Sequence, residues 1–237
     1  MKYCYVVLLV FTFSSCGFTT EEEYYNRAMN HEEKLDYINA IVMLDKAIAR
    51  NPDYKDALIF RGYCKSQIGK LREGTNDYQK ALKLEPNNTL TLFNLAGNYN
   101  ETKDYEKSIE YYNKALRSKY LKKCDATTEG KLLEIISPFG NSEETGYEVK
   151  ICELQYWRGL SYYENKEYDA AIRDLKKSIK GNFDNYGAYY YLGDIYLKKE
   201  ELQKACQNFS LAADLGNIEA AKKVAEICQN DEIKEKN

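Results

Sequence analysis

The sequence predicts an all-α fold in which about five helix pairs stack into an elongated solenoid, closed at the C-terminal end by a capping helix. Small residues recur with a period of 34, and large apolar residues recur at two other positions of the same period. Only 3 of the 237 residues are proline and 13 are glycine, which disfavours a turn-rich β fold. A period of this length is typical of two-helix units that bury their apolar faces only against neighbouring units.

The period is clearest in five blocks of 34 residues that begin at Glu21, Lys55, Thr89, Cys152 and Tyr186. The eighth, twentieth and twenty-seventh residues of every block are Gly, Ala or Ser, although these types make up only 41 of the 237 residues. Small side chains let two helix axes approach closely, so we expect these positions at the contact within each helix pair. They are Ala28, Gly62, Ala96, Gly159, Gly193, Ala40, Gly74, Ser108, Ala171, Ala205, Ala47, Ala81, Ala115, Ser178 and Ala212.

Larger apolar residues and two prolines complete the pattern. Position 17 carries Tyr or Leu in all five blocks and position 24 carries Leu, Tyr or Phe. Pro52 and Pro86 fall at position 32, where a proline ends the second helix and turns the chain into the next block. The pattern resembles the tetratricopeptide repeat family over about residues 21–229, apart from one insertion. The resemblance implies a right-handed superhelix that holds other molecules in a concave groove and carries out no catalysis.

Residues 1–15 are predicted to be a signal peptide. Lys2 provides a positive start, and the apolar run 5–13 is too short to cross a bilayer as a helix, which needs about 20 residues. The residues that end in Cys16 resemble a bacterial lipobox, although Phe13 stands where that pattern prefers Leu. The resemblance implies lipidation of Cys16, a tether over residues 16–20 and a lipid-anchored location, with the outer membrane favoured. A plain secretory signal and an uncleaved anchor are the alternatives.

Residues 123–151 interrupt the repeats. They separate the first three repeats, in residues 21–122, from the last two, in residues 152–217, and they contain Pro138 and three glycines. Such a long connection in a compact array is uncommon. It is either a degraded helix and loop packed on the array or an excursion that binds a partner.

Two cysteines flank this insertion. Cys124 and Cys152 would close its base with a disulfide in an exported protein, or they would be two unpaired, partly buried thiols. We expect Cys64, Cys206 and Cys228 to be small core residues on helix faces. No cysteine spacing resembles a zinc or redox motif, so no metal site is predicted.

The last part of the chain is predicted to cap the array. The residue pattern of block five, from Ala205 onward, also resembles the related Sel1-like repeats. Residues 218–229 are expected to form the capping helix, because the last repeat would otherwise expose its stacking surface. Its predicted apolar face carries Ile218, Ala221, Val224, Ala225 and Cys228. Residues 230–237 form a polar tail.

The family resemblance implies that the groove is lined by positions 2, 5, 9, 12 and 13 of each first helix. Family members that grip the C-terminal carboxylate of chaperone peptides use Lys at position 5 and Asn at position 9, and neither occurs there in any block. The surface is aromatic and acidic, which favours a peptide with apolar anchors and some positive charge. The alternative is that these tyrosines, among 23 in the chain, are half-buried filler. The candidate partner-binding residues are Tyr25, Met29, Ile59, Tyr63, Phe93, Asn100, Tyr156, Leu160, Tyr163, Tyr190 and Asp194.

Composition narrows the function. A net charge of −3 provides no electrostatic footprint for nucleic acid, and a single His leaves few routes to a catalytic triad or a metal site. No cofactor is predicted. The sequence therefore predicts a non-catalytic scaffold or adaptor of the bacterial cell envelope that binds a peptide or protein segment and is held to the membrane by an N-terminal lipid. The alternative is an accessory lipoprotein for glycan or nutrient capture, although Trp157 is the only tryptophan available to stack on a sugar.

Overall fold

The computed structural model describes residues 19–119, 121–124 and 148–228. Within these residues the chain forms eleven α-helices, no β-strand, and a final π-helical turn at Val224–Cys228. Consecutive helices pack in pairs, which confirms the predicted all-α solenoid. The five pairs are α1 (Glu21–Glu32) with α2 (Tyr37–Arg50), α3 (Lys55–Gln67) with α4 (Leu71–Leu84), α5 (Thr89–Glu101) with α6 (Tyr105–Ala115), α7 (Ile151–Glu164) with α8 (Tyr168–Lys180), and α9 (Asn185–Lys198) with α10 (Leu202–Asp214), followed by the cap α11 (Ile218–Lys223).

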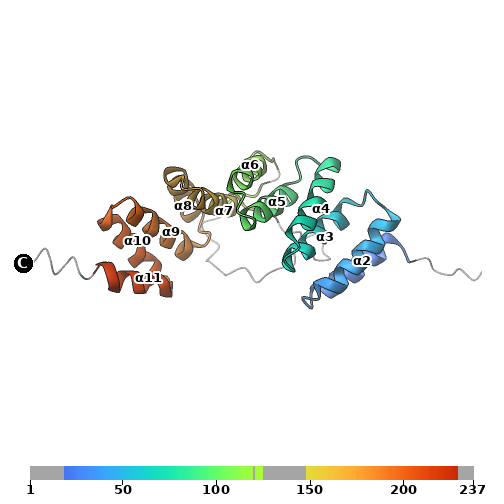
Figure 1. Ribbon diagram of the computed structural model, residues 1–237, viewed down its shortest axis with the longest axis horizontal. Helices are drawn as coiled ribbons and strands as arrows, with labels where there is room; N and C mark the ends of the chain where they lie inside the picture. The colour runs from blue at the N-terminus through green and yellow to red at the C-terminus, as the bar shows by residue number, and fades with distance from the viewer. Residues whose placement is uncertain (1–18, 120, 125–147, 229–237) are drawn as a thin grey trace, which may run out of the picture.

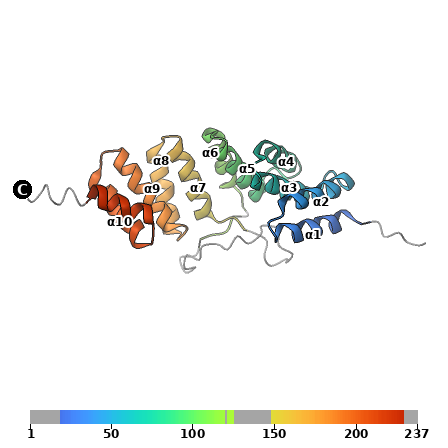
Figure 2. The ribbon, with the colours of Figure 1, turned by 60° about the horizontal axis from the view of Figure 1, so that its bottom comes forward.

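The pairs follow one another along the long axis of the molecule, from α1 and α2 at one end to α10 and α11 at the other (Figure 1). The array bends in this view, with α4, α6 and α8 on its outer side and α3, α5, α7 and α9 toward the inner side. Helix α6 packs on α7, so the stacking continues across the insertion (Figure 2).

The small residues of the period lie where the helices of each pair cross. All fifteen are buried, and so is the large residue at position 24 of every block. Position 17 is the first residue of the second helix in all five pairs. Close approach of the two helix axes therefore depends on the small residues, while the position-24 side chains fill the space beside them.

Each turn between paired helices has the same backbone conformation. The residue at position 15 is left-handed in all five blocks, with φ between 57° and 78°, and the next backbone N–H donates to the carbonyl of position 11. This arrangement is a Schellman cap, which satisfies carbonyls left free at the end of the first helix. The five left-handed residues are Leu35, Gly69, Lys103, Lys166 and Glu200.

The same substitution is expected to have opposite effects on stability at two glycines of the first helices. A Cβ at Gly193 would lie 2.6 Å from Cδ1 of Phe209, a fully buried ring, whereas a Cβ at Gly97 would meet no heavy atom within 4 Å. We expect Gly193→Ala to lower the free energy of unfolding by about 1–3 kcal/mol through overpacking. We expect Gly97→Ala to raise it by about 0.5–1 kcal/mol, because alanine restricts the unfolded chain and favours helix. Urea denaturation of both variants tests this, and shifts of the same sign would contradict it.

The base of the insertion is held together by backbone and disulfide bonds. The Lys122 N–H donates to the Val149 carbonyl at 3.2 Å, and the Ile151 N–H donates to the Lys122 carbonyl at 3.0 Å. A disulfide joins Cys124 to Cys152. Helix α7 begins at Ile151, within the predicted insertion, and residues 125–147 of that insertion lie outside the described residues.

A second disulfide joins Cys206 of α10 to Cys228 at the end of the π-helical turn. The expectation that these two are small core residues is therefore wrong, whereas Cys64 is a buried free thiol. The two cysteines are 22 residues apart in sequence, and they meet because the cap folds back onto α10.

The apolar face predicted for the cap is correct only at Val224 and Cys228, which contact the array. Ile218 is 76% exposed and Ala221 and Ala225 are exposed, whereas Ala220 is fully buried and Val224 packs on the core of the last two repeats. The prediction assumed a regular helix to residue 229. The chain instead passes from α-helix into a π-helical turn, and the disulfide to α10 sets which side faces the array.

Several predictions concern residues beyond the described ranges: the signal peptide 1–15, the lipidated Cys16 and the polar tail 230–237. Among the described helices, none has the length and apolar character needed to span a bilayer.

Candidate partner-binding face

The eleven predicted groove residues all lie on the first helices of the pairs, but four of them are not available to a partner. Met29, Ile59, Tyr156 and Leu160 are between 2% and 9% exposed and belong to the hydrophobic cores. Their inclusion was wrong, because neighbouring helices and aromatic rings cover these positions in the stacked array. The partly exposed residues are Tyr25, Tyr63, Phe93, Asn100, Tyr163, Tyr190 and Asp194.

Three of these residues meet in the last two repeats. The Tyr163 hydroxyl donates to Oδ2 of Asp194 at 2.6 Å, and Lys198 Nζ lies 2.8 Å from the same oxygen. The Tyr163 ring packs edge-on against Tyr191 with ring centroids 5.1 Å apart, and Tyr191 packs against Tyr190 at 5.6 Å. We call Tyr163, Tyr190, Tyr191, Asp194 and Lys198 the inner aromatic cluster.

The electrostatics of this cluster make it less acidic than its sequence indicates. Burial and the hydrogen bond to Asp194 raise the pKa of Tyr163 well above its usual value, so its hydroxyl stays protonated and remains a donor. Lys198 offsets the charge of Asp194 and lies 5.6 Å from the centroid of the Tyr163 ring. The cluster therefore presents aromatic rings held in fixed positions. Such rings lose little conformational entropy when they contact a partner.

The middle of the inner side has open space. Phe93 of α5 is partly exposed and lies 5.9 Å from the Tyr112 ring, and one turn further along the same helix Gly97 has no atom near its missing Cβ. The unfilled position beside this apolar ring can accommodate a side chain of another molecule.

Asn100 has a structural partner that the sequence did not indicate. Its Oδ1 accepts a hydrogen bond from the Ser161 hydroxyl at 3.0 Å, and Ser161 also lies 2.9 Å from the hydroxyl of Ser108. These side chains come from α5, α6 and α7, and so they join the third and fourth repeats. Part of the polar capacity of Asn100 is therefore used within the array.

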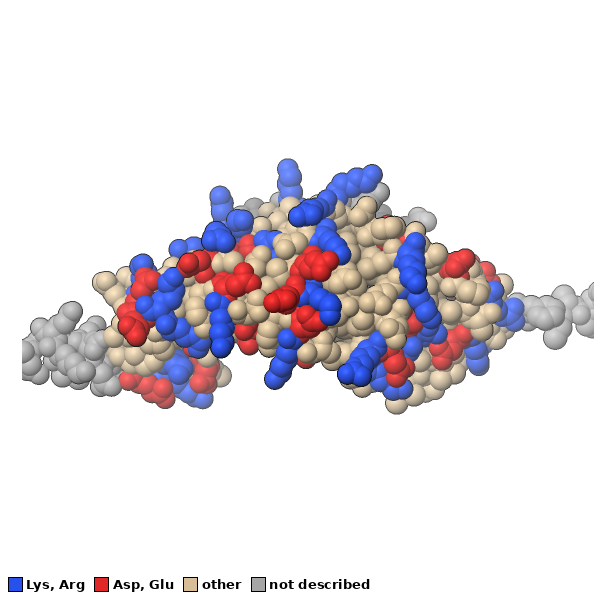
Figure 3. Space-filling view, turned by 45° about the horizontal axis from the view of Figure 1, so that its top comes forward, with Lys and Arg blue, Asp and Glu red and all other residues tan. Residues whose placement is uncertain are grey.

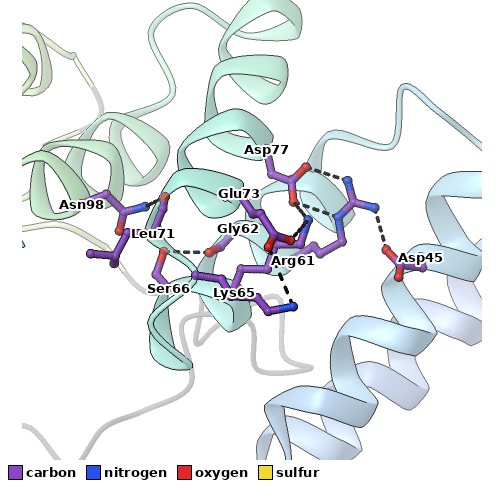
Figure 4. Close-up of polar contacts among 10 residues, drawn as sticks. Asp45, Arg61, Gly62, Lys65, Ser66, Leu71, Glu73, Asp77 and Asn98 are labelled. Carbon is purple, nitrogen blue, oxygen red and sulfur yellow. Dashed lines mark hydrogen bonds and ion pairs between the residues drawn. The ribbon is translucent and has the colours of Figure 1, made fainter. Parts of the chain in front are cut away.

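An arginine network, missed in the sequence, joins the first two repeats (Figure 4). Arg61 donates to both carboxylate oxygens of Asp77, at 2.8 and 2.6 Å, and to Asp45 of the preceding repeat at 2.7 Å. Lys65 donates to Asp77 at 2.9 Å, and Asp77 is only 2% exposed. These charges are paired within the array and are not available to a partner.

The same network recurs in the fourth repeat. Arg158 donates to both oxygens of Asp174, at 2.6 and 2.8 Å, and to Asn113 of the preceding repeat. In both blocks the arginine is at position 7 and the aspartate at position 23, with the third partner at position 25 of the block before. Arg and Asp at these fixed positions are therefore the signal in the sequence for this network, whereas the bonds themselves depend on how consecutive repeats stack.

The described residues contain no cluster suited to a metal ion. No three His, Cys, Asp or Glu side chains among them lie close enough to hold a metal ion. His31, the only histidine, lies 3.1 Å from Asp36, which also accepts a hydrogen bond from the Asn39 N–H at the start of α2. Basic and acidic side chains are intermixed over the face in Figure 3.

Comparisons with protein families and curated proteins agree with this architecture. Two family models described as tetratricopeptide repeat match, one at residues 156–217 and the other at residues 56–88 and 91–124, and together they cover more than half of the chain. The Hsp70-Hsp90 organizing protein of Triticum aestivum is 31% identical over 108 residues, which are 41% of this chain and 18% of that protein. Anaphase-promoting complex subunit 3 of Schizosaccharomyces pombe is 20% identical over 219 residues, which are 92% of this chain and 28% of that protein. The chain thus spans less than a third of the length of these relatives.

Solved structures show the same fold. MamA from Desulfovibrio magneticus RS-1 has a TM-score of 0.64 at 15% identity, covering 82% of this chain and 94% of that one. PilF from Pseudomonas aeruginosa has a TM-score of 0.61 at 20% identity, covering 83% of this chain and 77% of that one. At these identities the likeness is one of fold alone. From its 34-residue period, its stacked helix pairs and the matching family models, the chain belongs to the tetratricopeptide repeat family.

Proposed function

We propose that this protein is a non-catalytic interaction scaffold of the bacterial cell envelope, anchored through a lipid on Cys16, and that it holds a peptide or protein segment along the inner side of the array. Tetratricopeptide repeat proteins act as protein–protein interaction scaffolds and are generally not enzymes. The observation that carries the groove assignment is the inner aromatic cluster, in which Asp194 holds the Tyr163 ring in place by a 2.6 Å hydrogen bond.

The disulfides support the export part of this proposal. Cys124–Cys152 closes the base of the insertion and Cys206–Cys228 joins α10 to the cap, and disulfides persist in oxidising compartments such as the bacterial periplasm. A reducing cytosol would leave these four thiols unpaired.

The inner surface also indicates what kind of segment fits. Position 5 of the repeats carries Tyr, Ile or Phe, and position 9 carries Met, Tyr, Gly, Leu or Asp, so no Lys–Asn pair is available to clamp a terminal carboxylate. Aromatic rings on α9 and α5, with open space at Gly97, fit apolar side chains of an internal segment.

Site-specific photo-crosslinking in intact cells tests the proposal. A photoreactive phenylalanine analogue at Phe93 and one at Tyr190 should capture the same partner, because both occupy position 5 of their repeats, on the first helices α5 and α9. The control is the analogue at Glu106, an exposed residue of α6. Gly97→Trp should remove both crosslinks while far-UV circular dichroism stays unchanged, since the added ring enters open space.

Two results would count against this function. Equal capture from Glu106 would show that the partner does not distinguish the inner side, and crosslinks that survive Gly97→Trp would place the partner elsewhere.

The alternative of glycan capture rests on Trp157, which is 38% exposed beside Tyr156. Calorimetry with soluble oligosaccharides, comparing the protein with Trp157→Phe, tests that alternative.

A further inference from the structure

The outer face of α2 carries apolar residues where the other repeats are polar. Ile38 at position 18 is 67% exposed and Val42 at position 22 is 41% exposed. Leu35, in the turn before the helix, is 66% exposed. We call these three residues the α2 stripe. The residues at positions 18 and 22 of the other four repeats are Arg72, Asn76, Glu106, Glu110, Asp169, Arg173, Gln203 and Gln207.

Three cations surround one tyrosine beside this stripe. Arg27, Lys46 and Arg50 lie 5.8, 5.6 and 5.7 Å from the centroid of the Tyr24 ring. All three are exposed, and in the part of the chain that the structure describes none of them forms an ion pair. Lys46 lies one helical turn beyond Val42, so the apolar stripe and these cations form one continuous surface. We call Arg27, Lys46 and Arg50 the α2 cation cluster.

Two of the nearby acidic groups are engaged in other contacts. Asp45 pairs with Arg61 at 2.7 Å, toward the second repeat, and Glu23 accepts the Thr20 N–H in the capping box at the start of α1. Glu21 and Glu22 lie in the first turn of α1, where the helix dipole favours negative charge. The exposed cations of the cluster are therefore free to meet an anionic surface.

The cluster lies at the end of the array where the N-terminal segment joins. Tyr24 is one turn from the start of α1, its N–H donating to the Thr20 carbonyl at 3.2 Å, and α2 is at that end of the molecule (Figure 1). Thr20 is the fourth residue after Cys16, and four steps of extended chain span at most about 14 Å. A lipid on Cys16 would therefore hold Tyr24 and its three cations close to the bilayer surface.

We propose that the outer face of α2 docks on an anionic phospholipid bilayer. The α2 stripe enters the boundary between headgroups and acyl chains, and the α2 cation cluster contacts lipid phosphates, with Tyr24 at headgroup level. The proposal rests on the membrane location in the proposed function but not on the groove. Its consequence is that the array has a fixed orientation at the membrane.

Fluorescence quenching by brominated lipid tests the stripe directly. The chain has one tryptophan, so Trp157→Phe with Ile38→Trp leaves a single reporter on the stripe, and Trp157→Phe with Glu106→Trp places it at the same position of the third repeat. Both full chains carry an N-terminal hexahistidine tag and are bound to vesicles that contain phosphatidylglycerol, a nickel-chelating lipid and dibrominated phosphatidylcholine. This tag ensures that membrane proximity does not depend on Cys16. We expect strong quenching at position 38 and none at position 106.

The cation cluster is tested by affinity for phosphatidylglycerol vesicles without the nickel lipid. Lys46→Gln with Arg50→Gln should weaken binding by about fivefold for each charge removed. The matched control, Lys177→Gln with Lys180→Gln on α8, removes the same charge away from α2 and should bind like the parent chain. Residues 1–18 are the same in all three proteins, so any contribution from that segment cancels in the comparison. Loss of binding should be smaller at high salt, where the attraction is screened.

Each other outcome has a definite meaning. Equal quenching at positions 38 and 106, or none at 38, would overturn the docking proposal while leaving the crosslinking result on the groove intact. Concentration-dependent dimerisation in sedimentation velocity that Ile38→Glu abolishes, without quenching by lipid, would assign the stripe to a second copy of the chain and would equally overturn it. Crosslinks lost from the groove with quenching preserved would contradict only the groove.

Discussion

Replacing Arg61 with methionine is expected to lower the free energy of unfolding by about 3–5 kcal/mol, because it leaves a buried carboxylate without its main partner. Asp77 is 2% exposed and receives two of its three hydrogen bonds from Arg61. Lys65 retains one contact with Asp77, which places the loss toward the lower end of that range. Urea denaturation followed by circular dichroism measures the change.

The expected loss comes from an uncompensated charge, and a double variant isolates it. Arg61→Met with Asp77→Leu removes both charges and should recover most of the stability, since well-packed apolar residues often replace a buried ion pair without loss. Arg158→Met, the same change in the fourth repeat, should cost a similar amount because Asp174 is 3% exposed. A single Arg61→Met variant that loses less than about 1 kcal/mol, as an exposed ion pair would, contradicts this account.

Removing the Cys206–Cys228 disulfide, by Cys206→Ala with Cys228→Ala, is expected to lower the free energy of unfolding by about 2–4 kcal/mol. The bond closes a loop across 22 residues and attaches the cap to α10. The loss should be concentrated at the C-terminal end, because each repeat of a solenoid contacts only its neighbours. Amide hydrogen exchange should therefore speed up in α11 and the π-helical turn and stay unchanged in α1–α4.

Cys64 provides the control for this prediction. It is buried and unpaired in α3, so Cys64→Ala should leave hydrogen exchange in the cap unaltered and change it only around the first two repeats. If the double variant leaves protection in α11 unchanged, the disulfide is not what holds the cap in place.

The groove shows how far position in a repeat determines the role of a residue. Tyr156 and Tyr163 both occupy predicted groove positions, yet Tyr156 is 5% exposed and packs edge-on against Phe183, whereas Tyr163 is partly exposed and bonded to Asp194. The difference comes from the neighbouring repeat, which covers one ring and leaves the other accessible. The period alone contains no information on that coverage.

The α2 stripe is a contrasting case. Ile38 and Val42 could be recognised in the sequence by comparing each block with the others, because polar residues occupy their positions elsewhere. Their exposure still had to be seen in the structure, since an isolated Ile or Val in a helix is more often buried.

By itself, the sequence determined the number of helix pairs, the start of each pair to within one residue, and the residues at the helix crossings. The two helices of a pair are close in sequence, so small residues at a fixed spacing are enough to predict where the helices cross. The tertiary structure alone decided which cysteines bond, which arginines join consecutive repeats, and how the cap is turned against α10. These contacts bring together residues such as Asp45 and Arg61, or Cys206 and Cys228, whose proximity depends on how consecutive units stack and on where the final helix departs from regular geometry.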